Sequence, residues 1–126
     1  MAMAACNIGG KLGFVPHSGP FVRGIFVTLQ FENVDGLDQS ALHARVASAF
    51  DDCPFVRIVE GSPRVAAVAG TNFADIGVAA NENTSAIMVA LDNLGKGMAG
   101  QAVQAMNIAL GIPEAIALWQ PARFPS

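Results

Sequence analysis

Residues 75–91, DIGVAANENTSAIMVAL, contain two apolar runs separated by a short polar stretch. The runs, 75–80 and 84–91, have the length of strands, and Asn81-Glu82-Asn83 between them is suited to the loop of an antiparallel hairpin. This stretch therefore predicts an antiparallel hairpin.

Upstream of the hairpin, residues 22–31 alternate between apolar and polar positions. One face of the extended chain would carry large apolar side chains: Ile25, Val27, Leu29 and Phe31. Thr28 and Gln30 fall on the opposite face. This period of two predicts a strand with one face buried.

Between that strand and the hairpin, the sequence predicts one helix and two short extended runs. Asp38 is suited to be the N-cap of the helix, and Pro54 prevents the helix from running further. Its apolar residues recur at helical spacing: Leu42, Val46, Ala49 and Phe50. Residues 55–59 and 65–69 are both β-type runs, closed by glycine-containing turns.

Downstream of the hairpin, residues 96–110 predict a second helix, which Gly111 and Pro113 terminate. One stripe of this helix is apolar and is expected to pack on the sheet: Ala99, Val103, Met106 and Leu110. The other side has small or amide side chains: Gly97, Gly100, Gln101 and Gln104. Because this side leaves the backbone bare, a ligand or another domain can approach it, and Gly100→Ala is expected to stabilise the domain alone.

The order of these elements predicts an α+β fold, with a mostly antiparallel mixed sheet and helices packed on one face. Residues 1–13 are small and rich in glycine and are interpreted as a flexible leader. Residues 14–126 are interpreted as a single domain, and the sequence contains no internal repeat.

The composition fits one domain with a sizeable core, since 52% of the 126 residues are hydrophobic and 13% are charged. So low a charge indicates either a surface that a partner covers or a plain surface rich in Ala and Gly. The net charge of −3 and the scattered basic residues argue against a nucleic-acid partner. No targeting sequence or membrane span is predicted, so we expect a soluble cytoplasmic domain.

The sequence offers no catalytic constellation and no metal-ligand spacing. Cys53 follows a helix, where its thiolate would not be stabilised, and is interpreted as a small buried hydrophobic residue. Cys6 has no neighbouring base, and His43 is expected on a solvated helix face. A different enzyme that used His17 with Cys53 is a further hypothesis, but nothing in the sequence places these two residues together.

Several segments, in the same order along the chain, resemble N-acetyl-gamma-glutamyl-phosphate reductases. They are PHSGPFVRGI at 16–25, PFVRI at 54–58, GTNFADIG at 70–77, LDNLGKGMAGQAVQAMN at 91–107 and GIPEA at 111–115. The resemblance covers roughly residues 14–118. It departs from the family pattern at Gly95, where Val is usual, and at Ala74, where Cys is common.

The resemblance implies the C-terminal domain of such a reductase, with the fold of the glyceraldehyde-3-phosphate dehydrogenase C-terminal domain. In the family this domain provides a dimer sheet and one wall of the active-site cleft. The family reaction is the reductive dephosphorylation of an acyl phosphate, in which a cysteine thiolate is the nucleophile and NADPH supplies a hydride. The family's cofactor domain and nucleophile segment precede the matching region, so no catalytic residue is assigned here and the chain is expected to be inactive alone.

By the same resemblance, Asn93 and Gly97 are cofactor-binding candidates and Arg23 is a substrate-binding candidate. The Asn93 amide would meet the nicotinamide carboxamide; capping of the next helix is an alternative or additional role. Arg23 would face the substrate phosphate or carboxylate, or else pair with an acidic neighbour. The expected partners are a second copy of the chain and an NADP-binding domain.

Two questions stay open at this point. The chain is either an excised or naturally truncated part of an enzyme, or a free-standing dimerisation or binding module derived from the same fold. The parent substrate is either the acyl phosphate of arginine biosynthesis or a related one of lysine biosynthesis.

Overall fold

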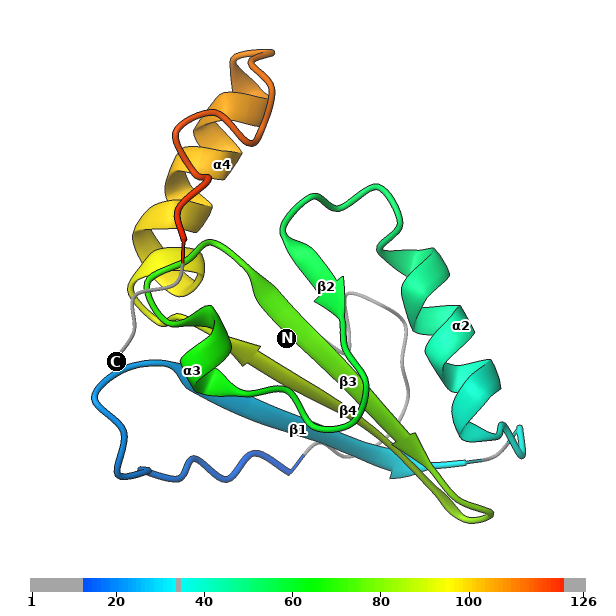
Figure 1. Cartoon of the computed structure of the whole chain (residues 1–126). Helices are drawn as coiled ribbons and strands as arrows, with labels where there is room; N and C mark the ends of the chain where they lie inside the picture. The colour runs from blue at the N-terminus through cyan, green and yellow to red at the C-terminus, as the bar shows by residue number, and fades with distance from the viewer. Residues whose placement is uncertain (1–12, 34, 122–126) are drawn as a thin grey trace.

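The structure, a computed structural model, describes residues 13–33 and 35–121 (Figure 1). Its elements are β1 (Ile25–Glu32), α2 (Gln39–Ala49), β2 (Val56–Ile58), α3 (Val65–Val68), β3 (Ala74–Ala80), β4 (Thr84–Leu91), a π-helical segment η1 (Gly95–Ala99) and α4 (Gly100–Ala109). The strands form one mixed sheet in the order β1-β4-β3-β2. Only β2 and β3 run parallel, so the predicted α+β fold with a mostly antiparallel mixed sheet is confirmed.

The predicted hairpin is present as β3 and β4, and it lies at the centre of the sheet. The Asn81 side-chain oxygen closes its loop by accepting hydrogen bonds from the backbone N–H groups of Asn83 (3.0 Å) and Thr84 (2.8 Å). The loop therefore organises itself through a local side-chain contact, which is why a short stretch of sequence was enough to predict it.

The helix α2 packs on one face of the sheet and forms the main apolar core with it. Its N-cap is Asp38, as predicted, because the Asp38 carboxylate accepts a 2.7 Å hydrogen bond from the N–H of Ala41. The buried members of this core are Leu42, Val46, Ile76 and Val78. The core thus lies over β3 and the neighbouring parts of β2 and β4.

The prediction that β1 has one buried face is wrong for the chain by itself. All eight residues of β1 are exposed, and Leu29 keeps 49% of its surface accessible. The reason is the position of β1 at the edge of the sheet, two strands away from the part that α2 covers. The exposed apolar residues of β1 and two half-buried residues of β4, which also border the α2 core, form a surface that we call the open face, defined by Ile25, Val27, Leu29, Phe31, Ile87 and Val89.

The prediction of a β-type run at 65–69 is also wrong, because residues Val65–Val68 form the short helix α3. A short apolar run does not distinguish a strand from a buried helical turn by periodicity. Here the chain crosses the face of β3 at Gly61, whose carbonyl oxygen lies over Gly77, and α3 then contacts β4. Val68 and Ala69 become buried there.

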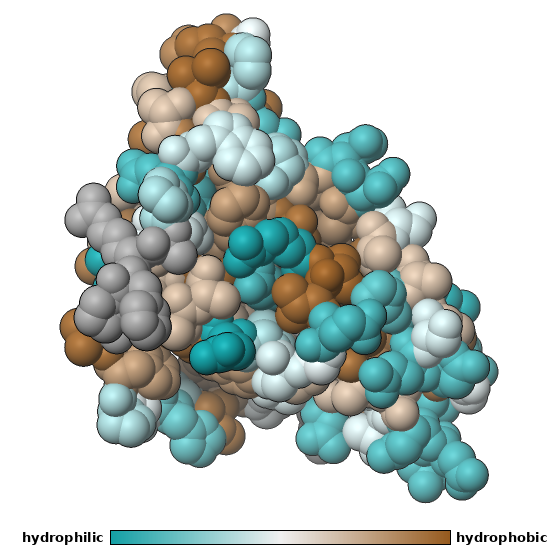
Figure 2. All heavy atoms as spheres, in the orientation of Figure 1, coloured by the Kyte–Doolittle hydropathy of each residue, from teal (hydrophilic) through white to brown (hydrophobic). Residues whose placement is uncertain are grey.

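The second predicted helix is present as η1 followed by α4, but its apolar stripe does not pack on the sheet. Met106 is 52% exposed and Leu110 is 66% exposed. Figure 1 shows why: η1 and α4 follow each other as one continuous helix, which extends away from the ends of the strands. Figure 2 shows apolar residues gathered over the far end of α4.

The segment after α4 folds back along the helix. Gly111 ends the helix with a φ of 68°. The buried Asn107 amide then donates hydrogen bonds to the carbonyl oxygens of Glu114 (3.2 Å) and Ile116 (3.0 Å). This return buries Leu118 and places Trp119 against Phe55, with ring centroids 5.4 Å apart.

Two further features bear on the sequence-based expectations. The predicted leader, residues 1–13, lies outside the described residues except for Gly13. None of the helices in the described parts of the chain has the length and apolar character needed to cross a membrane.

We expect Gly100→Ala to destabilise the chain, contrary to the expectation from helix propensity. A Cβ at this position would collide with the Asn72 side chain and lie 2.9 Å from the Gly95 carbonyl oxygen. This clash outweighs the gain of about 1 kcal/mol that Ala normally brings to a helix. Urea unfolding of Gly100→Ala beside Gln101→Ala, a change at an exposed neighbouring position, measures the effect. Equal or greater stability of Gly100→Ala would show that this side of the helix is free.

Candidate functional site

The site lies where β4 ends and η1 begins, and its centre is the carboxylate of Asp92. This side chain has no exposed surface. Its neighbours come from three distant parts of the chain: the residues before β1, the turn after α3 and the first turn of η1. Asp92 was not among the predicted site residues, although it belongs to the longest of the resembling segments, 91–107.

Both oxygens of the Asp92 carboxylate are fully used. Oδ1 accepts hydrogen bonds from the N–H groups of Leu94 (2.9 Å) and Gly95 (2.6 Å) and from Nη2 of Arg23 (2.7 Å). Oδ2 accepts from the N–H of Gly70 (2.5 Å) and lies 2.7 Å from Nε of Arg23. Asp92 therefore caps η1, and because its side chain has no exposed surface it is not accessible to a ligand.

The surroundings of Asp92 keep it ionised. Burial opposes its charge, but the hydrogen bonds from Arg23 and from the N–H groups of Gly70, Gly95 and Leu94 outweigh that cost and lower its pKa to about 2. The same contact raises the pKa of Arg23. The pair is thus charged throughout the physiological pH range.

Arg23, the substrate-binding candidate, has the acidic neighbour that the sequence analysis left as an alternative. Nη2 donates a 2.7 Å hydrogen bond to Asp92 Oδ1, whereas Nε lies 2.7 Å from Oδ2 as an ion-pair contact without hydrogen-bond geometry. The side chain is 31% exposed. One edge of the guanidinium therefore faces the protein, and part of the side chain remains accessible.

Asn93, the cofactor-binding candidate, follows Asp92 and is half-buried. Its Oδ1 accepts a 2.7 Å hydrogen bond from the backbone N–H of Gly24. The orientation of the amide is thereby assigned, since only its oxygen can accept from an N–H group. Among the described residues, no acceptor is hydrogen-bonded to Asn93 Nδ2, so the group that Asn93 offers to a ligand is a donor.

The alternative role weighed for Asn93, capping of the next helix, belongs to Asp92 instead. Gly97, the other cofactor-binding candidate, is exposed, but a Cβ there would lie 3.2 Å from the backbone oxygen of Asp92 and 3.2 Å from Leu91 Cδ1. Gly97 thus allows η1 to pack closely on the end of β4. Close packing inside the domain therefore explains the glycine at position 97 without a bound ligand.

A cavity of about 370 Å³ lies beside these residues, between Arg23, the turn after α3, the start of α4 and the returning C-terminal segment. Thr71 and Asn72 are buried in its wall. The Thr71 hydroxyl donates to the carbonyl oxygen of Val68 at 2.8 Å, and Asn72 Nδ2 donates to Gln104 at 3.3 Å. Asn93 does not line this cavity, so the cavity and the Asn93 donor are neighbouring but separate features.

A polar network ties η1 and α4 to the C-terminal segment. Lys96 Nζ donates to Gln104 Oε1 at 2.7 Å, and Gln104 Nε2 donates to Glu114 at 2.7 Å. Burial lowers the pKa of Lys96, and the nearby charge of Glu114 acts in the opposite direction. Gln104 was expected on a free face of the helix. It instead connects Lys96 to Glu114 through hydrogen bonds inside the domain.

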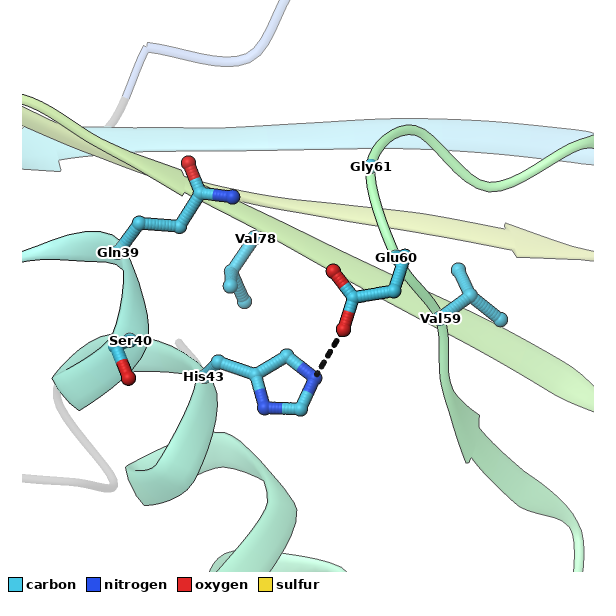
Figure 3. Close-up of a pocket in the computed structure, with 7 residues that line it drawn as sticks. All are labelled: Gln39, Ser40, His43, Val59, Glu60, Gly61 and Val78. Carbon is cyan, nitrogen blue, oxygen red and sulfur yellow. Dashed lines mark ion pairs between the residues drawn. The ribbon is translucent and has the colours of Figure 1, made fainter.

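A second cavity, of about 340 Å³, lies between α2 and the loop after β2. Figure 3 shows His43 and Glu60 pointing toward each other across it, with Nε2 and Oε1 separated by 3.9 Å. The Glu60 side chain is 92% exposed. At this distance the two side chains form at most a weak, exposed ion pair. The cavity therefore contains no strong ligand-binding group.

The expected burial of Cys53 is wrong, because the loop after α2 leaves it exposed. His17 is also exposed, and its Nδ1 lies 3.1 Å from the carbonyl oxygen of Val15. Nothing in the structure pairs these two residues with each other. Across residues 13–33 and 35–121, no group of three or more His, Cys, Asp or Glu side chains is placed to bind a metal ion.

We expect Asp92→Asn to cost roughly 2 kcal/mol of stability at neutral pH, which is the free energy of moving a carboxyl pKa from 3.8 to about 2. Because the folded-state pKa is lowered, this contribution is complete above pH 3.8 and is lost as the pH falls toward 2. Urea unfolding of both proteins between neutral pH and pH 2 should therefore show their stabilities converging in acid.

The matched control for that measurement is Asp35→Asn. Asp35 pairs with Arg45 at 3.2 Å, but both side chains are more than half exposed, at 57% and 64%. An exposed pair contributes at most about 1 kcal/mol. A loss for Asp92→Asn that is no larger than the loss for Asp35→Asn would contradict the central role of Asp92.

Comparison with known proteins places this site in a family. Residues 3–93 match the family model described as semialdehyde dehydrogenase, dimerisation domain. The chain is 39% identical to an N-acetyl-gamma-glutamyl-phosphate reductase of Methanosarcina barkeri, over 94% of the chain and 37% of that protein. It is 42% identical to the reductase of Thermus thermophilus, over 91% of the chain and 34% of that protein.

The chain therefore spans about a third of the length of the curated relatives that it matches. The family domain has the fold of the glyceraldehyde-3-phosphate dehydrogenase C-terminal domain, so the fold class expected from the resemblance is confirmed. The chain belongs to the semialdehyde dehydrogenase family and carries its dimerisation domain.

Proposed function

We propose that this chain provides the subunit interface and the nicotinamide-facing wall of an NADP-dependent N-acetyl-gamma-glutamyl-phosphate reductase. The observation that carries the proposal is the Asn93 amide, whose oxygen is fixed by Gly24 and whose Nδ2 is left as a donor. The names of the relatives support the reaction class. The chain covers about a third of these relatives, which supports a contribution to the enzyme rather than the whole of it.

The residues present fit a nicotinamide at one point only. A nicotinamide carboxamide has a carbonyl oxygen, and the Asn93 Nδ2 is a donor of fixed direction that matches it. When bound, NADPH would supply the hydride that reduces the acyl group. Asn93 would orient the carboxamide, and with it the face of the ring, by a hydrogen bond at the oxygen.

Gly97 would contribute to the same wall by keeping η1 close to β4. Arg23 borders the neighbouring cavity, and its accessible part would meet the phosphate or carboxylate of the substrate. Because Asp92 already matches its charge, this contact would be weaker than that of a free guanidinium. The relatives' names favour N-acetylglutamyl phosphate over the related acyl phosphate of lysine biosynthesis.

We assign no nucleophile to this chain. Cys53 lies in an exposed loop after α2, and the helix start at η1 faces Asp92 rather than a cysteine. The proposal therefore includes an NADP-binding part that also brings the reactive cysteine. By itself the chain would neither turn over the acyl phosphate nor bind NADP(H) tightly.

A free-standing dimerisation module is the second candidate function. It is favoured by the open face on β1 and β4, which presents aliphatic and aromatic side chains to solvent. The two candidates differ in the importance of Asn93, which a module used only for assembly would not need. The reading frame upstream of residue 1 also distinguishes them, because a cofactor domain there favours the enzyme.

We expect Asn93→Ala to raise the KM for NADPH about tenfold, the effect of losing one ordinary hydrogen bond, in a reductase assembled from this chain and a relative's NADP-binding part. Asn83→Ala, at the exposed tip of the hairpin, should leave the KM unchanged. The 3-acetylpyridine analogue of NADPH keeps the carbonyl oxygen but lacks the amide nitrogen, so Asn93→Ala should weaken it equally. An unchanged KM in Asn93→Ala would exclude the nicotinamide contact.

We expect the chain alone to self-associate in solution through the open face. Leu29→Lys places a charge on that face and should weaken association at least about tenfold, since a buried unpaired charge is strongly unfavourable. Gln30→Lys adds the same charge to the opposite side of β1 and should have little effect. Sedimentation velocity across micromolar concentrations measures both, and a wild-type monomer throughout would refute the prediction.

A further inference from the structure

The geometry points to Arg23 and Asp92 as positioning residues that set the direction of the Asn93 donor, an inference that rests on the proposed nicotinamide contact. Side-chain contacts connect the two residues that precede β1, Arg23 and Gly24, to the two residues that follow β4, Asp92 and Asn93. Arg23 pairs with Asp92, and the N–H of Gly24 donates to Asn93. The ion pair and the amide contact are therefore adjacent cross-links between the same two pieces of backbone.

The first cross-link is rigid. The guanidinium meets Asp92 through Nε and Nη2, both at 2.7 Å, and the carboxylate is itself fixed by three backbone N–H groups. The Nη2 hydrogen bond and the close approach of Nε to Oδ2 together hold the guanidinium against the carboxylate at two points. Arg23 is thus tied to the most constrained point of the site.

The second cross-link depends on the first. Gly24 has a φ of 117°, a conformation that favours glycine, and a Cβ there would collide with Val65. On its C-terminal side, Gly24 is followed by Ile25, which pairs with Leu91 in the sheet. On its N-terminal side, Gly24 is preceded by Arg23, whose side chain is held by Asp92, so release of Arg23 removes a restraint from that end of the Gly24 peptide.

The Gly24 N–H in turn decides what Asn93 presents. With that N–H in place, the amide oxygen is occupied and Nδ2 is presented as the donor. Without it, rotation by half a turn exchanges the two ends of the amide and presents an oxygen to a carbonyl oxygen, which is repulsive. Loss of the ion pair would therefore act on the nicotinamide end of NADPH and leave the rest of the cofactor unaffected.

The first test uses the chain itself and compares Arg23→Met with Arg45→Met, which removes an exposed ion pair. Hydrogen exchange measured by NMR should show the Gly24 amide exchanging about tenfold faster in Arg23→Met, the ratio expected for one lost hydrogen bond. The Asn93 side-chain resonances should shift in the same variant. Arg45→Met should change neither, and an unaltered Gly24 amide in a folded Arg23→Met protein would overturn the inference.

Arg23→Lys covers the case in which Arg23→Met does not fold. Lysine keeps the positive charge but cannot make the two-point contact, so Gly24 should still lose protection while the global stability is largely retained. Full protection of Gly24 in Arg23→Lys would show that charge alone suffices, and the positioning role of the guanidinium would be refuted.

The second test measures ligand binding in the reductase assembled with the NADP-binding part of the Thermus thermophilus relative. Arg23→Met should weaken NADPH about tenfold and leave 2′-phospho-ADP-ribose, which lacks the nicotinamide, unchanged. A merely destabilised protein would lose both ligands. If Asn93→Ala shows no such selectivity, the proposed nicotinamide contact fails; if Asn93→Ala is selective and Arg23→Met is not, only the positioning inference fails.

Discussion

The buried ion pair of Asp92 and Arg23 is the contact on which the rest of the site depends. An ionised carboxylate without exposed surface is very unfavourable unless hydrogen bonds and a countercharge surround it. Asp92 obtains them from the residues before β1, from the turn after α3 and from η1. The cost of leaving any of these groups unpaired forces the three segments to meet at one point, and the exit of the chain from β4 into α4 follows from that meeting.

Because three segments meet at Asp92, the backbone around the site is closely packed, and several positions there have room only for glycine. Gly95 lies so close to the Thr71 backbone that a Cβ would be 2.6 Å from its carbonyl oxygen, and Gly100 has no room beside Asn72. From the sequence, the bare backbone at these glycines was interpreted as a surface that a partner could approach. In the structure, most of it is covered by contacts inside the domain. The surfaces left for partners are instead the open face and the exposed end of α4.

Features determined by neighbouring residues were predictable from the sequence, whereas those determined by distant or absent groups were not. The Asn81 loop and the Asp38 cap are local, and both are present as predicted. The prediction that β1 is buried on one face failed because the alternation of apolar and polar residues shows which side of a strand is apolar. It does not show whether another part of the protein covers that side. The role of Asp92 escaped detection because its partner Arg23 is 69 positions away, and the helical turn at 65–68 escaped because four apolar residues carry no period.

The return of the C-terminal segment along α4 has a spectroscopic consequence. The chain has one tryptophan and no tyrosine, so its intrinsic fluorescence comes essentially from Trp119. Trp119 is 63% exposed and packs against the rings of Phe55 and Phe73, which directly precede β2 and β3. A change in emission wavelength or quenching therefore reports the detachment of residues after α4 from the sheet, an event that is distinct from the melting of the sheet itself.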